Sequence, residues 1–209
     1  MPVKDCKTEQ LIKDTAKRIF LTEGKMLATT QEIADAAGVN RTLLHYYFRS
    51  RDVLFNMVFK EALTKLRQRL HEILGSDLPF KQKVENLVNV FYEELTESPY
   101  LETFIALQLN QEPEKYEELF TGLPGGKERM KNFLKEIQSE MEKGNIAEMK
   151  PINFFINLFA LMAYPFVARP IYLKMFDLTD AAYGKLLAER KKSIVLMLFP
   201  DKALSSIIK

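Results

Sequence analysis

The chain has 209 residues, of which 47% are hydrophobic and 28% charged, a balance that excludes global disorder. A single cysteine, Cys6, excludes an internal disulfide framework and a cysteine-rich zinc site, and it favours a reducing compartment. The net charge is only +2, but residues 1–75 hold 13 Lys and Arg against 9 Asp and Glu, whereas residues 76–209 hold 17 against 19. A polyanion would therefore prefer the N-terminal part.

The sequence predicts helix along almost the whole chain. Glycine (8) and proline (9) are sparse, and tracts rich in Leu, Lys, Glu and Phe contain few breakers. The periodicity predicts an all-α fold of about nine helices, with ends uncertain by a few residues. We expect helices at 8–23, 29–37, 40–47, 50–74, 79–97, 99–110, 125–143, 151–175 and 179–199.

Residues 29–47 predict a helix, a three-residue turn with glycine, and a second helix. In "TTQE" (29–32), Thr29 stands three residues before Glu32, the capping-box spacing. Gly38 ends this helix, and Asn40 is a favoured N-cap for the next one. This arrangement is the helix-turn-helix unit, which places its second helix in the major groove of DNA.

The second helix of this unit has two chemically different sides. Val39, Leu44 and Phe48 share one face and should anchor the helix to the two before it. The opposite side offers a guanidinium, a hydroxyl, an imidazole and a phenol, which suit base edges and phosphates. We expect DNA contacts from these residues and their neighbours: Thr30, Gln31, Asn40, Arg41, Thr42, His45, Tyr46, Tyr47 and Arg51.

The stretch "TTQEIADAAGVNRTLLHYYFRSRDVLF" (29–55) resembles the N-terminal signature of the TetR family of bacterial transcriptional repressors. That signature has a threonine-capped helix with Ile-Ala, then Gly-Val-Ser/Asn, then a short helix ending Leu-Tyr-x-Tyr-Phe, then a basic pair and an acid. His45 stands where the family usually has tyrosine, and Thr42 where it often has glycine or alanine. Both departures bear on the operator sequence, and His45 on pH dependence.

The resemblance implies a division of the chain. Residues 1–49 would form the helix-turn-helix DNA-binding domain, and residues 50–209 a helical domain for ligand binding and dimerisation. The protein would be a ligand-responsive regulator, a repressor that binds a palindromic operator as a homodimer through helix 40–47. We expect a cytoplasmic location, and no signal peptide, catalytic residue, metal site or cofactor.

The dimer interface is expected at roughly 152–199. The segment 152–176 is apolar nearly all round, so one face needs the protein's own core and another needs a partner. Residues 152–168 are about as long as a membrane core, but Asn153, Asn157 and Pro165 interrupt them, and we expect no membrane contact. Pro165 and Pro170 predict a kink in this helix.

The resemblance also implies a cavity among the central helices, for a small apolar or amphipathic effector whose binding releases the DNA. Such aromatic stripes at helical spacing are also typical of an ordinary core. The residues assigned to the cavity are Phe91, Phe104, Leu107, Gln108, Phe133 and Ile137.

Two other functions stay open. The chain could be an all-helical binding protein or enzyme with a hydrophobic pocket, in which the N-terminal unit is structural only. It could also be a helical adaptor whose apolar C-terminal helices bind a different protein. Salt-dependent DNA affinity would separate the regulator from both.

Overall fold

The computed structural model describes residues 6–111 and 123–199, without the side chains of Gln108, Leu109 and Gln111. The regular secondary structure in these parts of the chain is all helical, as the sequence predicts. They contain ten α-helices and one π-helical segment, η1. The elements are α1 (Cys6–Lys17), η1 (Arg18–Thr22), α2 (Thr30–Ala36), α3 (Arg41–Phe48), α4 (Arg51–Leu74), α5 (Phe80–Glu97), α6 (Leu101–Gln111), α8 (Gly126–Glu142), α9 (Pro151–Val167), α10 (Arg169–Met175) and α11 (Asp180–Leu198).

Two elements differ from the expected helices. The helix expected at 8–23 changes to π-helical winding at Arg18, and its last turn donates from Glu23 N–H to the Arg18 carbonyl at 2.9 Å. The helix expected at 151–175 is two helices that meet at Ala168 with a bend of 63°. This break confirms the kink that the two prolines predict, and it raises the helix count to ten.

The prolines act differently at this break. Pro165 lies inside α9, where its missing N–H removes one helical hydrogen bond. Its own carbonyl accepts a hydrogen bond from the hydroxyl of Tyr183 on α11 at 2.7 Å. Pro170 lies in the first turn of α10, where a backbone N–H would have no partner within the helix. The chain can therefore turn sharply at Ala168 with few lost hydrogen bonds.

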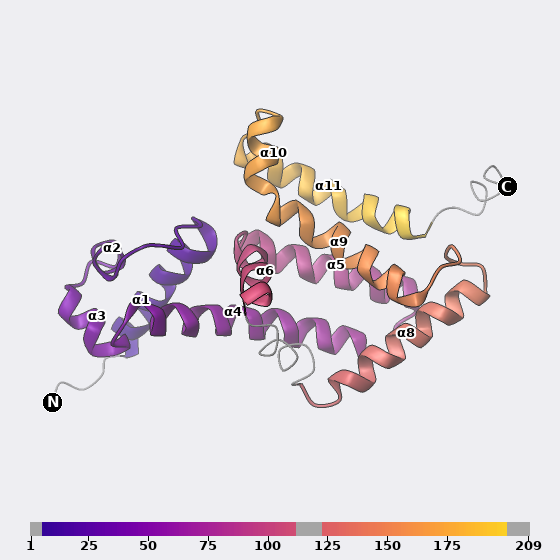
Figure 1. Cartoon of the computed structure of the whole chain (residues 1–209), viewed down its shortest axis with the longest axis horizontal. Coiled ribbons are helices and arrows are strands. Elements are labelled where there is room, and N and C mark those ends of the chain that lie inside the picture. The colour runs from indigo at the N-terminus through magenta and orange to yellow at the C-terminus, as the bar shows by residue number, and fades with distance from the viewer. Residues whose placement is uncertain (1–5, 112–122, 200–209) are drawn as a thin grey trace.

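The helices form an elongated molecule with a small N-terminal unit at one end (Figure 1). Helices α1, α2 and α3 gather around the start of α4, which runs from this unit along the base of the rest of the chain. Helix α5 packs on α4, and α9 and α11 cover α5 on its other side. Buried apolar side chains from both ends belong to one continuous core.

Helix α4 joins the two parts of this core. Its buried residues near the start, Leu54 and Phe55, face the N-terminal unit, and the ring of Phe55 packs edge-on against Phe20 at 5.1 Å. The same ring also contacts Phe104 of α6, whose ring is tilted by 45° and whose centroid lies 4.8 Å from that of Phe55. A movement of α4 is therefore felt in both parts.

Candidate nucleic-acid interface

The α2–α3 unit begins with the expected capping box. The Thr29 hydroxyl accepts from Glu32 N–H at 3.2 Å, and the Thr29 N–H donates to the Glu32 carboxylate at 2.7 Å. This second bond lowers the pKa of Glu32 because it favours the charged carboxylate. Asn40 caps α3 in the same way, accepting from Leu43 N–H at 2.7 Å. Gly38 turns the chain between the helices with φ +66°.

The inner face of α3 fixes its position. Leu44 and Phe48 are fully buried and Val39 is partly buried against the core, as the spacing predicts. Arg41, Thr42 and Tyr46 lie on the other side and are exposed. A helix anchored along one face thus presents a guanidinium, a hydroxyl and a phenol to solvent, which is the form that a major-groove reading helix needs.

His45 is tied to the end of its own helix. Its Nδ1 lies 2.8 Å from the carbonyl oxygen of Arg49. A carbonyl can only accept, so Nδ1 carries the proton and the neutral ring keeps Nε2 as an acceptor. Arg49 itself has a positive φ of 59°, which is unusual for a residue with a side chain. The imidazole therefore holds a strained turn at the end of α3.

The two tyrosines form an aromatic pair on α3. Their rings meet edge to face at 5.4 Å, and the ring of Tyr47 also lies 6.2 Å from that of Phe48. Tyr46 is the outer member and is 44% exposed, whereas Tyr47 is partly buried. Tyr47 therefore supports the outer ring as well as bordering the exposed face.

The predicted contacts on α2 lie at its start. Thr30 is the first residue of the helix and is partly exposed. Gln31 is exposed, and its amide donates to the carboxylate of Asp35 at 2.7 Å. The start of a helix presents unpaired N–H groups, which favour an anion such as a backbone phosphate.

Arg51 points into the protein, unlike the residues above. Its guanidinium donates to the carbonyls of Ala28, at 3.2 Å, and Met26, and to the carboxylate of Asp52 at 2.8 Å. It also lies over the rings of Phe20 and Phe55, 5.3 and 5.4 Å from their centroids. These contacts connect the loop before α2 to α4. A phosphate contact by Arg51 would require the guanidinium to leave them.

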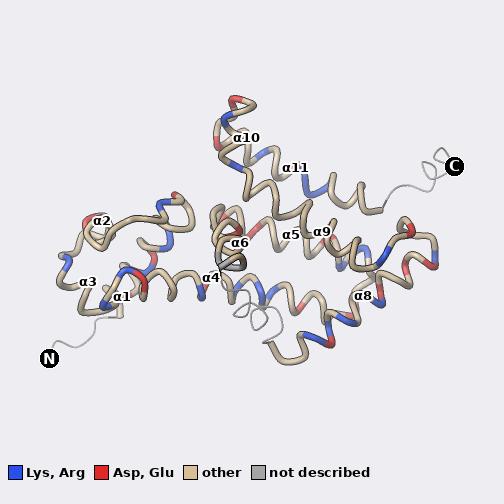
Figure 2. The backbone as a smooth tube through the Cα atoms, viewed as in Figure 1, with Lys and Arg blue, Asp and Glu red and all other residues tan. Residues whose placement is uncertain are grey.

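Figure 2 shows where the charges lie. Basic residues occur at the outer end of the N-terminal unit, around α3, whereas α9 carries no charged residue at all between Pro151 and Val167. Arg49, which is exposed and follows α3 directly, was not among the predicted contacts. Its position in the basic pair after the helix was the available signal.

Most residues assigned to an effector cavity are packed in the core. Phe133 and Ile137 are fully buried, Phe91 packs on Phe159 and Phe166, and Phe104 packs on Phe55 and Phe59. Leu107 is 48% exposed, and the side chain of Gln108 lies outside the described residues. The structure contains a small cavity of about 70 Å³ between α4, α8 and α9, and none of these residues lines it. It is lined by Arg67, Leu70, His71, Leu74, Leu123, Gly126, Met130, Phe155 and Phe159.

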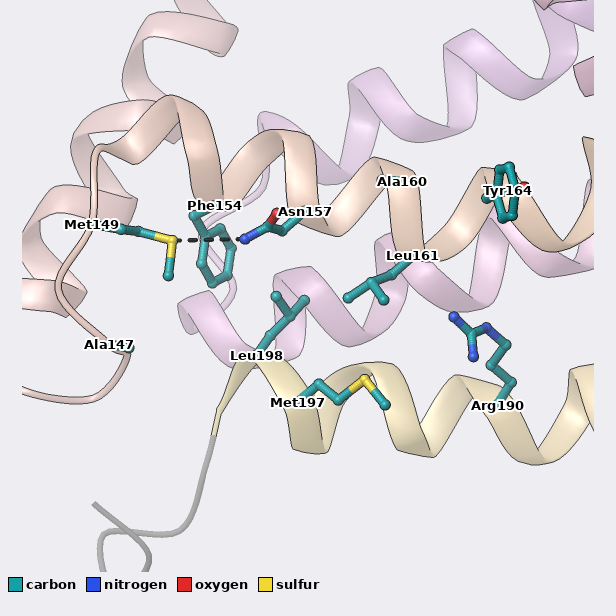
Figure 3. A pocket seen from close by; sticks show the side chains of 10 residues that line it. All are labelled: Ala147, Met149, Phe154, Asn157, Ala160, Leu161, Tyr164, Arg190, Met197 and Leu198. Carbon is teal, nitrogen blue, oxygen red and sulfur yellow. Dashed lines mark hydrogen bonds between the residues drawn. The ribbon is translucent and has the colours of Figure 1, made fainter. Parts of the chain in front are cut away.

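Helices α9 and α11 leave large apolar side chains exposed. Ile156 and Tyr164 of α9 are 55% and 58% exposed, and Leu196 and Met197 of α11 are 65% and 61% exposed. Between the two helices runs a groove of about 460 Å³ (Figure 3). Phe154 and Met149 lie at one end of it, and Arg190 points from α11 toward α9 at the other.

Arg190 was not predicted as a functional residue. Its Nε is buried and, among the described residues, has no hydrogen-bond partner, and the same holds for the hydroxyl of Tyr92. Burial raises the pKa of Tyr92 to about 12, although nearby Arg190 acts in the opposite direction. The residue stands in a charged run, "AERKK", which on its own is typical of a solvated surface.

Within the described residues, no group of three or more His, Cys, Asp and Glu side chains is placed to hold a metal ion. No single helix there is long and apolar enough to cross a membrane; the bent pair α9 and α10 together has the necessary length and composition.

Comparisons with known proteins match the N-terminal unit first. The family model described as "Bacterial regulatory proteins, tetR family" matches residues 12–58. The HTH-type transcriptional repressor KstR2 of Rhodococcus jostii is 32% identical over 85 residues, which are 41% of this chain and 42% of that protein. The probable acrEF/envCD operon repressor of Escherichia coli K12 is 34% identical over 85 residues, 39% of this chain and 38% of that protein. These matches thus span about two fifths of the curated relatives, at 42% and 38%.

Solved structures match almost the whole chain. The ketosteroid transcriptional regulator KstR2 of Mycobacterium tuberculosis superposes with a TM-score of 0.67 at 14% identity, covering 95% of this chain and 97% of that one. The fatty acid degradation regulator FadR of Bacillus halodurans does so with a TM-score of 0.57 at 18% identity, covering 92% and 97%. At these identities the likeness is one of fold: an N-terminal helix-turn-helix unit followed by a helical domain.

Proposed function

From the premise that the chain belongs to the TetR family of bacterial regulatory proteins, we propose that it is a transcriptional regulator that binds DNA through α3 and represses. The carrying observation is the exposed polar face of a helix whose other face is fully buried. Two matched relatives are repressors by name, which supports repression. In this proposal residues 1–49 read DNA, and residues 50–209 bind the effector and the second subunit.

Helix α3 lies in the major groove. Arg41, at its first position, pairs with a guanine, for which the two parallel N–H groups of a guanidinium are suited. Thr42, His45 and Tyr46 meet neighbouring bases or phosphates from the same exposed side. The phosphate backbone of the DNA is contacted by four further residues: Asn40, Tyr47, and Thr30 and Gln31 at the start of α2. Arg51 supports this surface from inside, through the carbonyls before α2.

The protein acts as a homodimer through α9 and α11, within the expected segment 152–199. One reading helix touches only a short stretch of DNA, and two related by a dyad double the contacts on a palindrome whose half-sites lie about 34–36 Å apart or a multiple of this. The exposed apolar residues of α9 and α11 support this proposal, because a soluble chain gains stability when they leave water. Arg190 would lie at the rim of this interface.

A small apolar or amphipathic effector releases the DNA by moving α4, the helix shared by both parts. The cavity beside α4 measures about 70 Å³, far below the ~300 Å³ or more that a typical ligand pocket needs. Effector binding must therefore enlarge it by separating α8 and α9 from α4. We keep Phe91, Phe104, Leu107, Gln108, Phe133 and Ile137 as proposed residues of the enlarged site.

The regulator is proposed to work in the cytoplasm, without a membrane partner, an enzymatic activity or a cofactor. The alternative is an all-helical binding protein or enzyme with a structural N-terminal unit. It would leave the polar face of α3 without a function and predicts no salt-dependent binding to DNA.

The first experiment is the selection of bound duplexes from a random DNA pool at near-physiological salt, followed by sequencing. Enrichment of a palindrome with two half-sites would establish a sequence-specific dimeric regulator. No enrichment from folded, dimeric protein, with or without a library of small apolar acids and bases, would support the alternative.

A second experiment separates base reading from general attraction. Arg41→Ala should weaken binding to the selected palindrome by about 10–100-fold and relax the base preference at one position of each half-site. Lys131→Ala, which removes an exposed charge on α8, outside α3 and the proposed dimer face, is the control and should leave binding unchanged. Equal affinities of the parent and Arg41→Ala would show that α3 is not the reading helix.

A further inference from the structure

The N-terminal unit is attached to the rest of the chain at two places. The first is α4, which is continuous between both parts over 24 residues. The second lies where the turn after η1 meets the connection between α5 and α6. Figure 1 shows α6 between the N-terminal unit and helices α5 and α9, above α4. Because this second attachment lies away from the axis of α4, it restricts rotations and tilts of the N-terminal unit that α4 alone would allow.

The second attachment is a close contact between Gly24 and Tyr100. Gly24 has φ +69°, and a Cβ atom at this position would lie 2.6 Å from Cζ of the Tyr100 ring. Real Cβ atoms do not come this close, so a side chain at position 24 would displace the end of the Tyr100 ring. Two features favour glycine at position 24: the positive φ of the turn and the closeness of the Tyr100 ring. The second feature is visible only in the structure.

Two hydrogen bonds join the same segments. The backbone N–H of Tyr100 donates to the carbonyl of Leu21 at 3.0 Å, and the hydroxyl of Thr22 donates to the carbonyl of Glu97 at 3.2 Å. Leu21 and Thr22 are the last two residues of η1, where the π-helical winding ends. At the end of a helix the backbone carbonyls have no donor within the helix, so the Leu21 carbonyl can accept a hydrogen bond from Tyr100. The π-helical segment thus presents its last turn to the start of α6.

Tyr100 is in turn held by Arg169 from the break between α9 and α10. The guanidinium lies 5.9 Å from the centre of the Tyr100 ring, and one of its nitrogens lies 3.5 Å from the Tyr100 hydroxyl. The other terminal nitrogen donates to the carboxylate of Asp180, at the start of α11, at 2.6 Å. The Arg169 side chain is only 16% exposed. A chain of contacts therefore runs from the N-terminal unit through Tyr100 and Arg169 to the helices of the proposed dimer face.

We propose that Tyr100, held by Arg169, is a positioning residue that sets the angle between the DNA-reading unit and α9–α11. This inference rests on the proposed function, because the angle acts by fixing how far apart the two reading helices of a dimer stand. A 24-residue helix is about 36 Å long, and a tilt of about 5° at one end moves the other by roughly 3 Å. Roughly 3 Å is close to the rise of one base pair, so the contact selects the half-site spacing.

The test measures affinity for duplexes with the selected half-sites separated by the parent's best spacing and by one and two base pairs more and fewer. Tyr100→Ala and Arg169→Gln should move the preferred spacing by at least one base pair, or reduce the preference for it by about tenfold, with the same base preferences within each half-site. Tyr100→Phe keeps the ring on Gly24 and should have the smaller effect. A uniform loss of affinity at all spacings, or parental ratios, would overturn the proposal.

Gly24→Ala and Gly144→Ala form a matched pair of controls. Both glycines have a positive φ, +69° and +70°, so both substitutions strain the backbone, but nothing lies within 4 Å of a Cβ at Gly144. Only Gly24→Ala should change the spacing preference. If both variants lose stability equally and neither changes it, the Tyr100 contact does not set the angle.

A distance measurement separates this proposal from the proposed function, since it needs no DNA. Cys6 is the single cysteine of the sequence and is exposed on α1, and Lys185→Cys adds an exposed site on α11. Spin labels at both positions, diluted into unlabelled protein, report the distance between the two parts by double electron–electron resonance. Tyr100→Ala should broaden or shift this distance. An unchanged distribution would overturn the positioning role, whatever the protein does with DNA.

Discussion

Helices α3 and α9 expose opposite kinds of side chain. Helix α3 buries Leu44 and Phe48 and turns polar groups outward, whereas α9 buries Phe154 and Leu158 and still leaves Ile156 exposed. Each helix packs one face into the core and leaves a second face exposed to solvent, but the chemistry of the exposed face differs. Polar groups on a rigid helix suit the grooves and phosphates of DNA. Apolar groups in water suit another protein surface.

The comparison of α3 with α9 shows which kinds of functional surface can be predicted from sequence. Residues for DNA reading come in a dense local motif, because one short helix and its caps must supply them all. The proposed dimer face is spread over two helices, α9 and α11, and its residues look like core residues until the structure shows which of them remain exposed. Five substitutions test the comparison, in decreasing order of expected effect.

Ile156→Asp tests the apolar face. In the proposed subunit interface a carboxylate at this position would be buried without a partner, so the dimer dissociation constant should rise by about 1000-fold or more. Sedimentation equilibrium measures this change. Asn132→Asp, on the exposed side of α8, adds the same charge away from this face and should leave the dimer intact. A dimer that survives Ile156→Asp would place the subunit contact elsewhere.

Arg51→Ala tests whether this residue belongs to the inside of the reading unit or to its surface. Because the substitution removes the hydrogen bonds to the Ala28 and Met26 carbonyls and two cation–π contacts, the free energy of unfolding should fall by about 3 kcal/mol. Urea denaturation gives this value. The dependence of DNA affinity on salt should keep its slope; a shallower slope at unchanged stability would restore Arg51 to the phosphate contacts.

Glu102→Gln tests a carboxyl of the C-terminal part. Burial raises the pKa of Glu102 to about 7, from an ordinary value of 4.5. The folded state then binds a proton that the unfolded state has released, so stability falls as pH rises from about 4.5 through 7. Glu102→Gln lacks this loss, and should be more stable than the parent by up to ~3 kcal/mol at pH 8 and equal to it at pH 4.

Glu32 is the contrasting carboxyl of the N-terminal unit. The Thr29 N–H lowers its pKa, so its charged form adds stability above the unfolded pKa, and this stability is lost as pH falls through the folded pKa. Glu32→Ala should therefore destabilise the protein at pH 8, the opposite sign to Glu102→Gln. Thermal unfolding of both variants at pH 4 and pH 8 decides it; parallel pH profiles would contradict both assignments.

Arg49→Gly sharpens the comparison at the end of α3. The positive φ of 59° costs a residue with a side chain about 1 kcal/mol, which glycine avoids. The variant should be more stable than Arg49→Ala by this amount, and both should bind DNA slightly more weakly because they lack one positive charge. If Arg49→Gly is no more stable than Arg49→Ala in urea, the turn is not strained.

Local features could be predicted from the sequence. The caps at Thr29 and Asn40 are where they were expected, because each cap depends only on the next three residues. The buried face of α3 follows from helical spacing alone. The all-α architecture follows from long periodic segments with few breakers.

Features that depend on distant partners could not be predicted in this way. The direction of Arg51 depends on carbonyls more than 20 residues earlier in the chain, and a basic residue in the first turn of a helix next to a DNA-reading motif looks the same in either role. The hydrogen bond from the Tyr183 hydroxyl to the Pro165 carbonyl, close to the α9–α10 break, joins two helices and could not be read from the local pattern. The dual reason for glycine at position 24 depends on Tyr100, 76 positions further on.

Because α4 packs in both parts of the molecule, it limits where the N-terminal unit can be exchanged between related proteins. Leu54, Phe55 and Val58 are buried and belong to the packing of the reading unit, although they stand after the expected boundary at residue 49. A chimera joined at that boundary would pair the first three helices of one regulator with a foreign start of α4. Exchange of operator specificity between relatives should therefore carry at least the first two turns of α4 with the graft, together with whatever residue stands at position 24.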